Sequence, residues 1–87
     1  MYPDLLGEFI MTLIKKGYRV SIDRDPIADG IKIHIITYDP VPYNVVKTMT
    51  FDELNSMTKD TQKIWLDGII EWVELEFLRL RRRLRND

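Results

Sequence analysis

One segment decides how this chain folds: TQKIWLDGIIEWVELEFLRLRRRLR, residues 61–85. It contains no proline, and its apolar residues recur every three or four positions, which predicts one continuous helix. At 1.5 Å per residue such a helix is about 38 Å long. A globule of 87 residues has an expected diameter of only about 30 Å. We therefore expect the helix to overhang its own domain and to present a cationic end.

The apolar stripe of this helix is wider than one sheet face requires. The stripe consists of Leu66, Ile69, Ile70, Val73, Phe77, Leu80 and Leu84. Two tryptophans lie beside it, and two interpretations of them are open: they pack on the sheet, or they anchor an interface, where tryptophan and arginine are enriched. On the second interpretation, the residues expected to mediate self-association into a homodimer are Trp65, Trp72, Phe77, Leu80 and Leu84.

The segment ends in an arginine cluster. Its members, the expected partner-binding residues, are Arg79, Arg81, Arg82, Arg83 and Arg85. Two cations would suffice to complement the helix dipole, and arginine favours planar contacts to carboxylate or phosphate. Residues 1–78 hold 8 Lys/Arg and 13 Asp/Glu, a balance of −5, whereas residues 79–87 hold 5 Arg and 1 Asp, a balance of +4. This asymmetry indicates a partner: a protein, including an acidic second copy, or a nucleic acid. A solvated helix end is the remaining interpretation.

The rest of the chain predicts one helix, three strands and a short helix. A helical pattern begins at Asp4 and stops at Gly17, because glycine commonly follows the last helical turn. Alternating apolar and polar residues predict strands over residues 18–23, 31–38 and 43–50. Short polar turns separate them, so an antiparallel meander is the simplest arrangement. Thr50 and Glu53 have the spacing of a capping box, which predicts a short helix after the third strand.

The element order αβββαα predicts an α+β fold. We expect a three-stranded antiparallel sheet packed on one face by the N-terminal helix and the long C-terminal helix. Residues 1–87 form a single domain, with residues 79–87 as an arginine-rich helical extension. The chain has no cysteine, which argues against disulfides and fits a reducing compartment. It shows neither a signal-peptide pattern nor a stretch apolar enough to span a bilayer, so we expect no membrane association and a cytoplasmic location.

No pattern in the chain indicates catalysis. His34 is the only histidine and falls on the outward parity of its strand, which excludes a multi-histidine metal site. The acidic loop at residues 23–30 fails the EF-hand pattern, because its fifth, sixth and twelfth positions are Ile27, Ala28 and His34. Carboxylates on the long helix read as a solvated acidic face, and neither a phosphate-binding glycine loop nor a nucleophile motif is present. We expect no enzyme activity, no cofactor and no metal.

The element order and length resemble small proteins encoded by phages and prophages of Gram-positive bacteria, and among them some type II anti-CRISPR proteins. This resemblance implies a non-enzymatic inhibitor that binds a defence protein of the bacterial host, such as a CRISPR effector nuclease, stoichiometrically. Inhibitors of this layout that mimic DNA are strongly acidic, whereas this chain has a net charge of −1 and an arginine-rich end. The alternative function is accessory binding of nucleic acid through that end.

Overall fold

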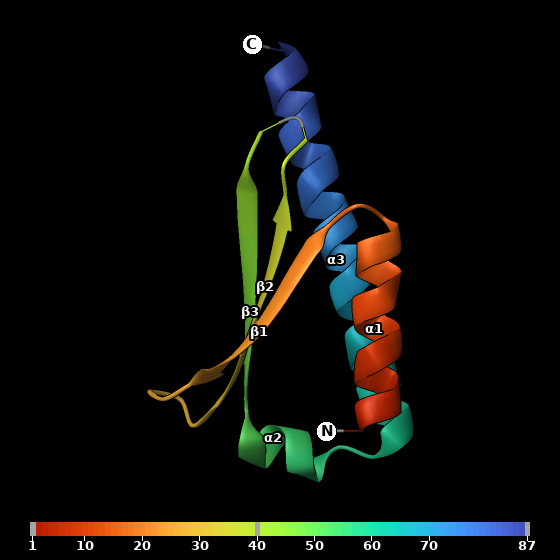
Figure 1. The fold of residues 1–87 in the computed structure, drawn as a ribbon, viewed down its shortest axis with the longest axis vertical. Helices are drawn as coiled ribbons and strands as arrows, with labels where there is room; N and C mark the ends of the chain where they lie inside the picture. Colours follow the sequence, from red (N-terminus) through yellow and green to blue (C-terminus); the bar gives the residue numbers. More distant parts are fainter. Residues whose placement is uncertain (1, 40, 87) are drawn as a thin grey trace.

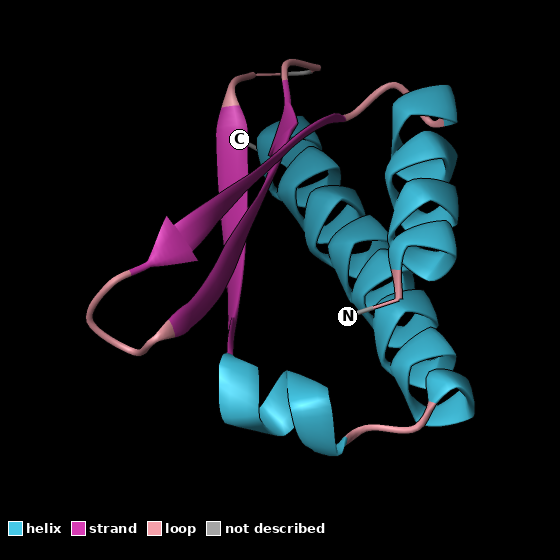
Figure 2. Cartoon of the chain, turned by 60° about the horizontal axis from the view of Figure 1, so that its bottom comes forward, coloured by secondary structure: helices cyan, strands magenta, loops and turns pink. Residues whose placement is uncertain are grey.

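A computed structural model describes residues 2–39 and 41–86 of the chain. The elements are α1 (Pro3–Lys15), β1 (Arg19–Asp25), β2 (Gly30–Thr37), β3 (Tyr43–Thr50), α2 (Phe51–Ser56) and α3 (Lys59–Asn86) (Figure 1). The strands form one antiparallel sheet in the order β1-β2-β3. Helices α1 and α3 lie side by side on one face of the sheet (Figure 2). The predicted α+β fold and its element order are confirmed.

Helix α1 begins and ends where its sequence directs it. Pro3 lies in the first turn, where its missing N–H costs no hydrogen bond. Gly17 follows the last turn with a φ of 93°, a left-handed conformation that glycine adopts without steric cost. Leu5, Phe9 and Leu13 form the buried face of the helix. Their spacing of four residues places them in one row against α3 and the sheet.

The β1–β2 hairpin turns through the acidic loop. Asp25 is buried, and its Oδ1 accepts hydrogen bonds from the backbone N–H groups of Ile27 and Ala28. Gly30 follows, and a Cβ atom at this position would lie 2.0 Å from the carbonyl oxygen of Met49 on β3. Only glycine therefore permits β2 and β3 to pair this closely at the start of β2. Turn geometry accounts for Asp25 and Gly30 without a bound ion.

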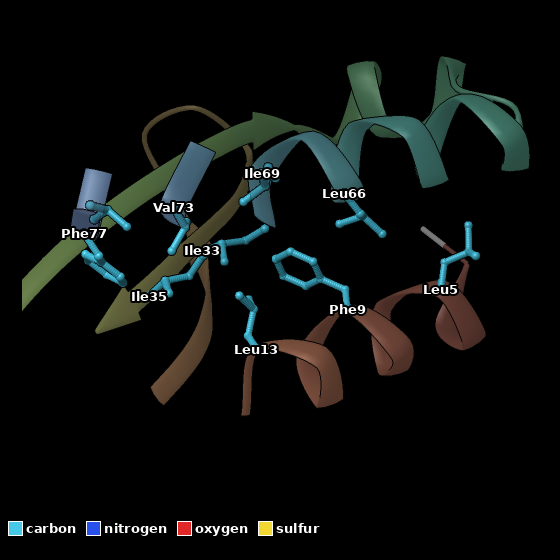
Figure 3. Packing of buried hydrophobic residues seen from close by; sticks show 10 residues of the cluster. Leu5, Phe9, Leu13, Ile33, Ile35, Leu66, Ile69, Val73 and Phe77 are labelled. Carbon is cyan, nitrogen blue, oxygen red and sulfur yellow. The ribbon is translucent and has the colours of Figure 1, made fainter. Parts of the chain in front are cut away.

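The core lies between the sheet and the two long helices (Figure 3). Its buried members are Leu5, Phe9, Leu13, Ile33, Ile35, Val45, Leu66, Ile69, Val73 and Phe77. Phe77 packs edge-to-face against Tyr18 and Tyr43, with ring centroids 4.9 Å and 6.1 Å away. Such aromatic pairs add about 0.5–1.5 kcal/mol each to the stability that burial alone provides. The core therefore reaches along α3 at least as far as Phe77.

Helix α3 runs nearly the whole length of the molecule. It has 28 residues, about 42 Å at 1.5 Å per residue, and the longest extent of the molecule is 44 Å. Its C-terminal end extends beyond the sheet (Figure 1), so the predicted overhang is confirmed. At its start, the Oγ1 atom of Thr58 accepts a hydrogen bond from the N–H of Thr61. None of the described helices is both long and apolar enough to cross a membrane.

The N-cap at Thr50 that the capping-box spacing predicted before α2 is also confirmed. The Oγ1 atom of Thr50 accepts a hydrogen bond from the N–H of Glu53 at 3.1 Å and donates one to the Glu53 carboxylate at 3.0 Å. The side chain thus satisfies an N–H that has no partner within the helix. This cap ends β3 and starts α2 without an intervening loop.

Candidate interaction surface on the long helix

Burial along the apolar stripe of α3 falls towards its C-terminal end. Val73 and Phe77 are 0% and 1% exposed, Leu80 is 8% exposed and Leu84 is 41% exposed. The periodicity continues unchanged while the sheet that covers it comes to an end. The stripe therefore belongs to the core up to Leu80 and to the surface at Leu84.

Two of the residues expected to mediate self-association lie inside the domain. Phe77 contacts Tyr18 and Tyr43 in the core, and Leu80 is buried on the same side of α3. Neither side chain is available to a second copy while the domain is folded. The reason is that the far ends of the strands reach farther along α3 than periodicity alone can show. Only Leu84 of the stripe offers substantial surface there.

The two tryptophans occupy the flank of α3 that faces β3. Trp65 and Trp72 are half-buried and pack against the edge of the core. Together with Gly68, Ile69 and Lys47 they line a shallow hollow. Lys47 places its Nζ atom 5.5 Å from the ring centroid of Trp72, within the range of a cation–π contact. Packing against the core thus accounts for part of each tryptophan, whereas their role as anchors of an interface stays a prediction.

The arginine cluster, defined as Arg79, Arg81, Arg82, Arg83 and Arg85, lies on and around the overhanging end of α3. Within the described residues, its one ion pair joins Arg79 to Glu76 of the same helix at 2.9 Å. Arg81 and Arg85 line a hollow with Leu84 and Asp39 of the β2–β3 connection. Among the described residues, most of the positive charge of this end therefore has no counter-charge in direct contact.

Besides the apolar stripe, α3 carries another row of residues, which is exposed and was not predicted from the sequence. We call it the outer stripe; its members are Ile64, Gly68, Glu71, Leu75, Leu78, Arg82 and Arg85. They are separated by alternating steps of four and three residues, so they share one side of the helix, the side opposite the core. Ile64, Leu75 and Leu78 are 73%, 53% and 41% exposed. The alternating spacing was visible in the sequence, but the more apolar core stripe obscured it.

Charge changes sign along the outer stripe. Glu71, with Glu74 beside it, precedes the two leucines, and these four residues line one hollow. Arg82 and Arg85 follow the leucines. Glu74 is paired with Lys16 at the end of α1, and this hydrogen bond raises the pKa of Lys16. From Glu71 onward the stripe is therefore acidic, then apolar, then basic along the direction of the chain.

The open face of the sheet is a weaker candidate. Its side chains are those of Arg19, Ser21, Asp23, Lys32, His34, Ile36, Asn44, Val46 and Thr48. His34 lies on this face, as the alternation predicted, with its Nε2 atom 3.8 Å from Oδ2 of Asp23. Arg19 donates a hydrogen bond to the Tyr38 hydroxyl at 3.4 Å. Both signs of charge are mixed here, whereas the end of α3 is uniformly cationic.

Comparison of the chain with protein-family models, with curated proteins and with solved structures finds no match. Within residues 2–39 and 41–86, no three His, Cys, Asp or Glu side chains gather in a way that would hold a metal ion.

Proposed function

We propose that this protein acts without catalysis, as an interaction module that binds a protein partner stoichiometrically through the exposed end of α3. The observation that carries this proposal is the arginine cluster on a helix end that extends beyond the sheet, with one ion pair among the described residues. A helix that is packed in the core up to Leu80 holds such an end in a defined position. Preorganisation of this kind lowers the entropy lost on binding.

The surroundings of the arginines favour a protein over a nucleic acid. Leu75 and Leu78 continue the same surface as exposed apolar side chains, and an apolar centre with an arginine-containing rim is typical of protein interfaces. Glu71 and Glu74 lie immediately beyond them and would repel phosphate groups. Nucleic-acid surfaces are more uniformly positive, so binding of DNA or RNA is the second candidate.

The resemblance in element order points to the class of partner to test first. A defence protein of a bacterial host, such as a CRISPR effector nuclease, is the partner that this resemblance implies. The protein would then be a small inhibitor encoded by a phage or another mobile element, acting in the cytoplasm. The arginine cluster would bind an acidic surface of that partner.

A capture experiment from bacterial lysate tests the proposal. The bait proteins are the wild type, the double variant Arg82→Glu/Arg83→Glu, and the matched control Arg19→Glu/Lys32→Glu, which makes the same charge change on the open sheet face. We expect the wild type and the control to retain one protein at a fixed molar ratio, and the double variant to lose it. Equal capture by all three baits, or capture of nothing by the wild type, would overturn the proposal.

Titration with labelled DNA and RNA separates the second candidate. Contacts between several arginines and phosphates make affinity fall steeply with salt. Tight, salt-dependent binding that Arg82→Glu/Arg83→Glu abolishes would replace the protein partner by a nucleic acid. Weak binding that is equal for the wild type and the variant supports the protein partner.

A further inference from the structure

We infer that the outer stripe of α3 pairs with the same stripe of a second copy, in antiparallel orientation, with Leu75 and Leu78 at the centre. The inference rests on the proposed use of α3 as a binding surface and names a partner for it. It differs from the dimer expected from sequence, because Phe77 and Leu80 of that interface are buried. The outer stripe takes their place.

The spacing of the outer stripe suits the packing of two helices. Steps of four and three residues are the repeat of a left-handed coiled coil, in which each exposed residue packs between residues of the facing helix. The stripe keeps this spacing from Ile64 to Arg85. Residues 68–85 would pair over about 27 Å of helix. α1 and the sheet lie against other sides of α3 (Figure 2), and the exposure of Ile64, Leu75 and Leu78 shows that this side is open.

The order of charges sets the orientation. When Leu75 faces Leu78 of a second copy, the antiparallel register also sets Glu71 opposite Arg82 and Gly68 opposite Arg85. The twofold symmetry repeats each pair, so every acidic–basic contact occurs twice. Nothing lies within 4 Å of a Cβ atom placed on Gly68, which leaves room there for the long arginine side chain.

The flanks of the stripe agree with this register. In an antiparallel pair, residues that flank the contact row on the same side of each helix approach each other. Glu74 precedes Leu75 and Arg81 precedes Arg82, so Glu74 comes near Arg81 of the second copy. On the other flank Arg79 approaches the exposed side of Trp72 of the second copy. An arginine over a tryptophan ring adds about 0.5–1 kcal/mol at an exposed site. The same register therefore gives a partner to Trp72 and to the arginines Arg79 and Arg81.

A parallel pair has no such complementarity. It would place Glu71 against Glu71 and Arg82 against Arg82, and like charges across an interface are unfavourable. The acidic part of the stripe faces the basic part of the second copy, and the leucines face each other, only when the two helices run in opposite directions. The apolar centre is small, with two leucines from each copy, so we expect a dissociation constant in the micromolar range.

Charge reversal in the purified protein tests the pairing. In sedimentation equilibrium the mass of the wild type should rise from 10.4 kDa towards twice that value as concentration increases. Glu71→Arg and Arg82→Glu should each weaken association by about tenfold or more. The double variant Glu71→Arg/Arg82→Glu should restore it, because the swapped charges again face opposite partners. A mixture of the two single variants should associate better than either alone.

The outcomes separate this inference from the proposed function. A wild type that stays monomeric at all concentrations, or a double variant that fails to recover, overturns the pairing. Arg19→Glu is the control and should leave association unchanged, and circular dichroism establishes that each variant is folded. A wild type that captures a lysate partner but does not pair with a second copy overturns the inference and leaves the proposed function standing. A wild type that pairs but captures no partner does the reverse.

Cysteine cross-linking tests the orientation directly, since the chain has no cysteine of its own. Leu75→Cys and Leu78→Cys, carried on chains of different mass, should form mixed disulfide dimers in excess of either self-linked species. In the antiparallel register the two copies of Ile64→Cys lie at opposite ends of the paired helices, far from each other, so this variant should remain uncrosslinked. Efficient self-linking of Ile64→Cys would show a parallel pair and overturn the inference.

Discussion

The two ends of α3 are held in different ways. At the N-terminal end Gln62 is 1% exposed, donates a hydrogen bond to the Leu54 carbonyl and accepts one from the Tyr2 N–H. Lys59 pairs with Asp4 of α1 at 2.7 Å. At the C-terminal end Leu84 is 41% exposed. The ion pair of the arginine cluster joins two residues of the helix itself.

This difference shows how one helix can serve both stability and binding. Up to Leu80 the helix derives its position from contacts with α1, α2 and the sheet. Beyond Leu80 it depends on the hydrogen bonds of the helix and on arginines that complement the helix dipole. The anchored part therefore carries the exposed end as a rigid extension, and substitutions in the two parts should have separable effects.

The largest expected contrast is between Phe77 and Leu84, which lie on the same apolar stripe. Phe77→Ala should lower the free energy of unfolding by about 3–5 kcal/mol, because it leaves a cavity beside Tyr18 and Tyr43. Leu84→Ala should lower it by less than about 1 kcal/mol. Urea unfolding followed by circular dichroism measures both values. Equal losses would mean that the core extends to the end of α3.

The next contrast concerns the buried hydrogen bonds at the N-terminal end. Gln62→Ala should lower the free energy of unfolding by about 1–3 kcal/mol. The substitution removes the hydrogen-bond partner of the Tyr2 N–H and of the Leu54 carbonyl at a buried position. The control Arg83→Ala, on the exposed end, should change it by no more than about 0.5 kcal/mol. The same unfolding measurement applies. A neutral Gln62→Ala would contradict the view that this end is anchored by its side chain.

Changing the charge at the exposed end of α3 should have a smaller effect on stability. Arg85→Glu should lower the stability by about 0.3–1 kcal/mol, because it places a negative charge at the negative end of the helix dipole. Arg85→Gln should fall between this variant and the wild type. Thermal unfolding at low salt measures the order of the three proteins. The differences in stability among the three proteins should shrink when salt is raised, because salt screens charges. Differences that persist at high salt would argue against an electrostatic cause.

The smallest effect is the pH dependence of the Asp4–Lys59 pair. The hydrogen bond to Lys59 holds the pKa of Asp4 below its ordinary value of 3.8. The contribution of the pair is thus present above pH 3.8 and is lost as the pH falls through the folded pKa. The same bond raises the pKa of Lys59 above 10.5. That contribution is complete below pH 10.5 and is lost as the pH rises through the folded value.

Comparing the wild type with Asp4→Asn across pH checks this sign. The stability difference between the two proteins should be present at neutral pH and should vanish in acid. Both side chains are exposed, so solvent screens the pair and the difference stays small. A difference that grows on acidification would contradict the assignment.

Local patterns were sufficient for the fold. Alternation over three short segments, a glycine stop after α1 and the N-cap at Thr50 each depend on neighbours within a few residues, and each was confirmed. Strand ends were less well predicted. β1 extends to Asp25 rather than ending at residue 23, because pairing with β2 extends the strand up to the turn.

The surface was harder to predict, because exposure depends on how far the strands reach along α3. Lys47 shares parity with core residues of β3 and lies over Trp72, a position that its charge did not suggest. Phe77 and Leu84 have the same place in the helical repeat and differ completely in burial. Periodicity shows which residues share a side of a helix but not what covers that side.

The sequence by itself determined the element order, the length of α3 and the uneven distribution of charge, because these follow from local backbone preferences and from composition. Only the tertiary structure decided where the cover over α3 ends. Burial at a given residue depends on contacts with residues distant in the chain, and the sheet buries Leu80 but leaves Leu84 exposed. The overhang with its arginines was thus predictable, whereas the exposure of the outer stripe beside them was decided only by the packed fold.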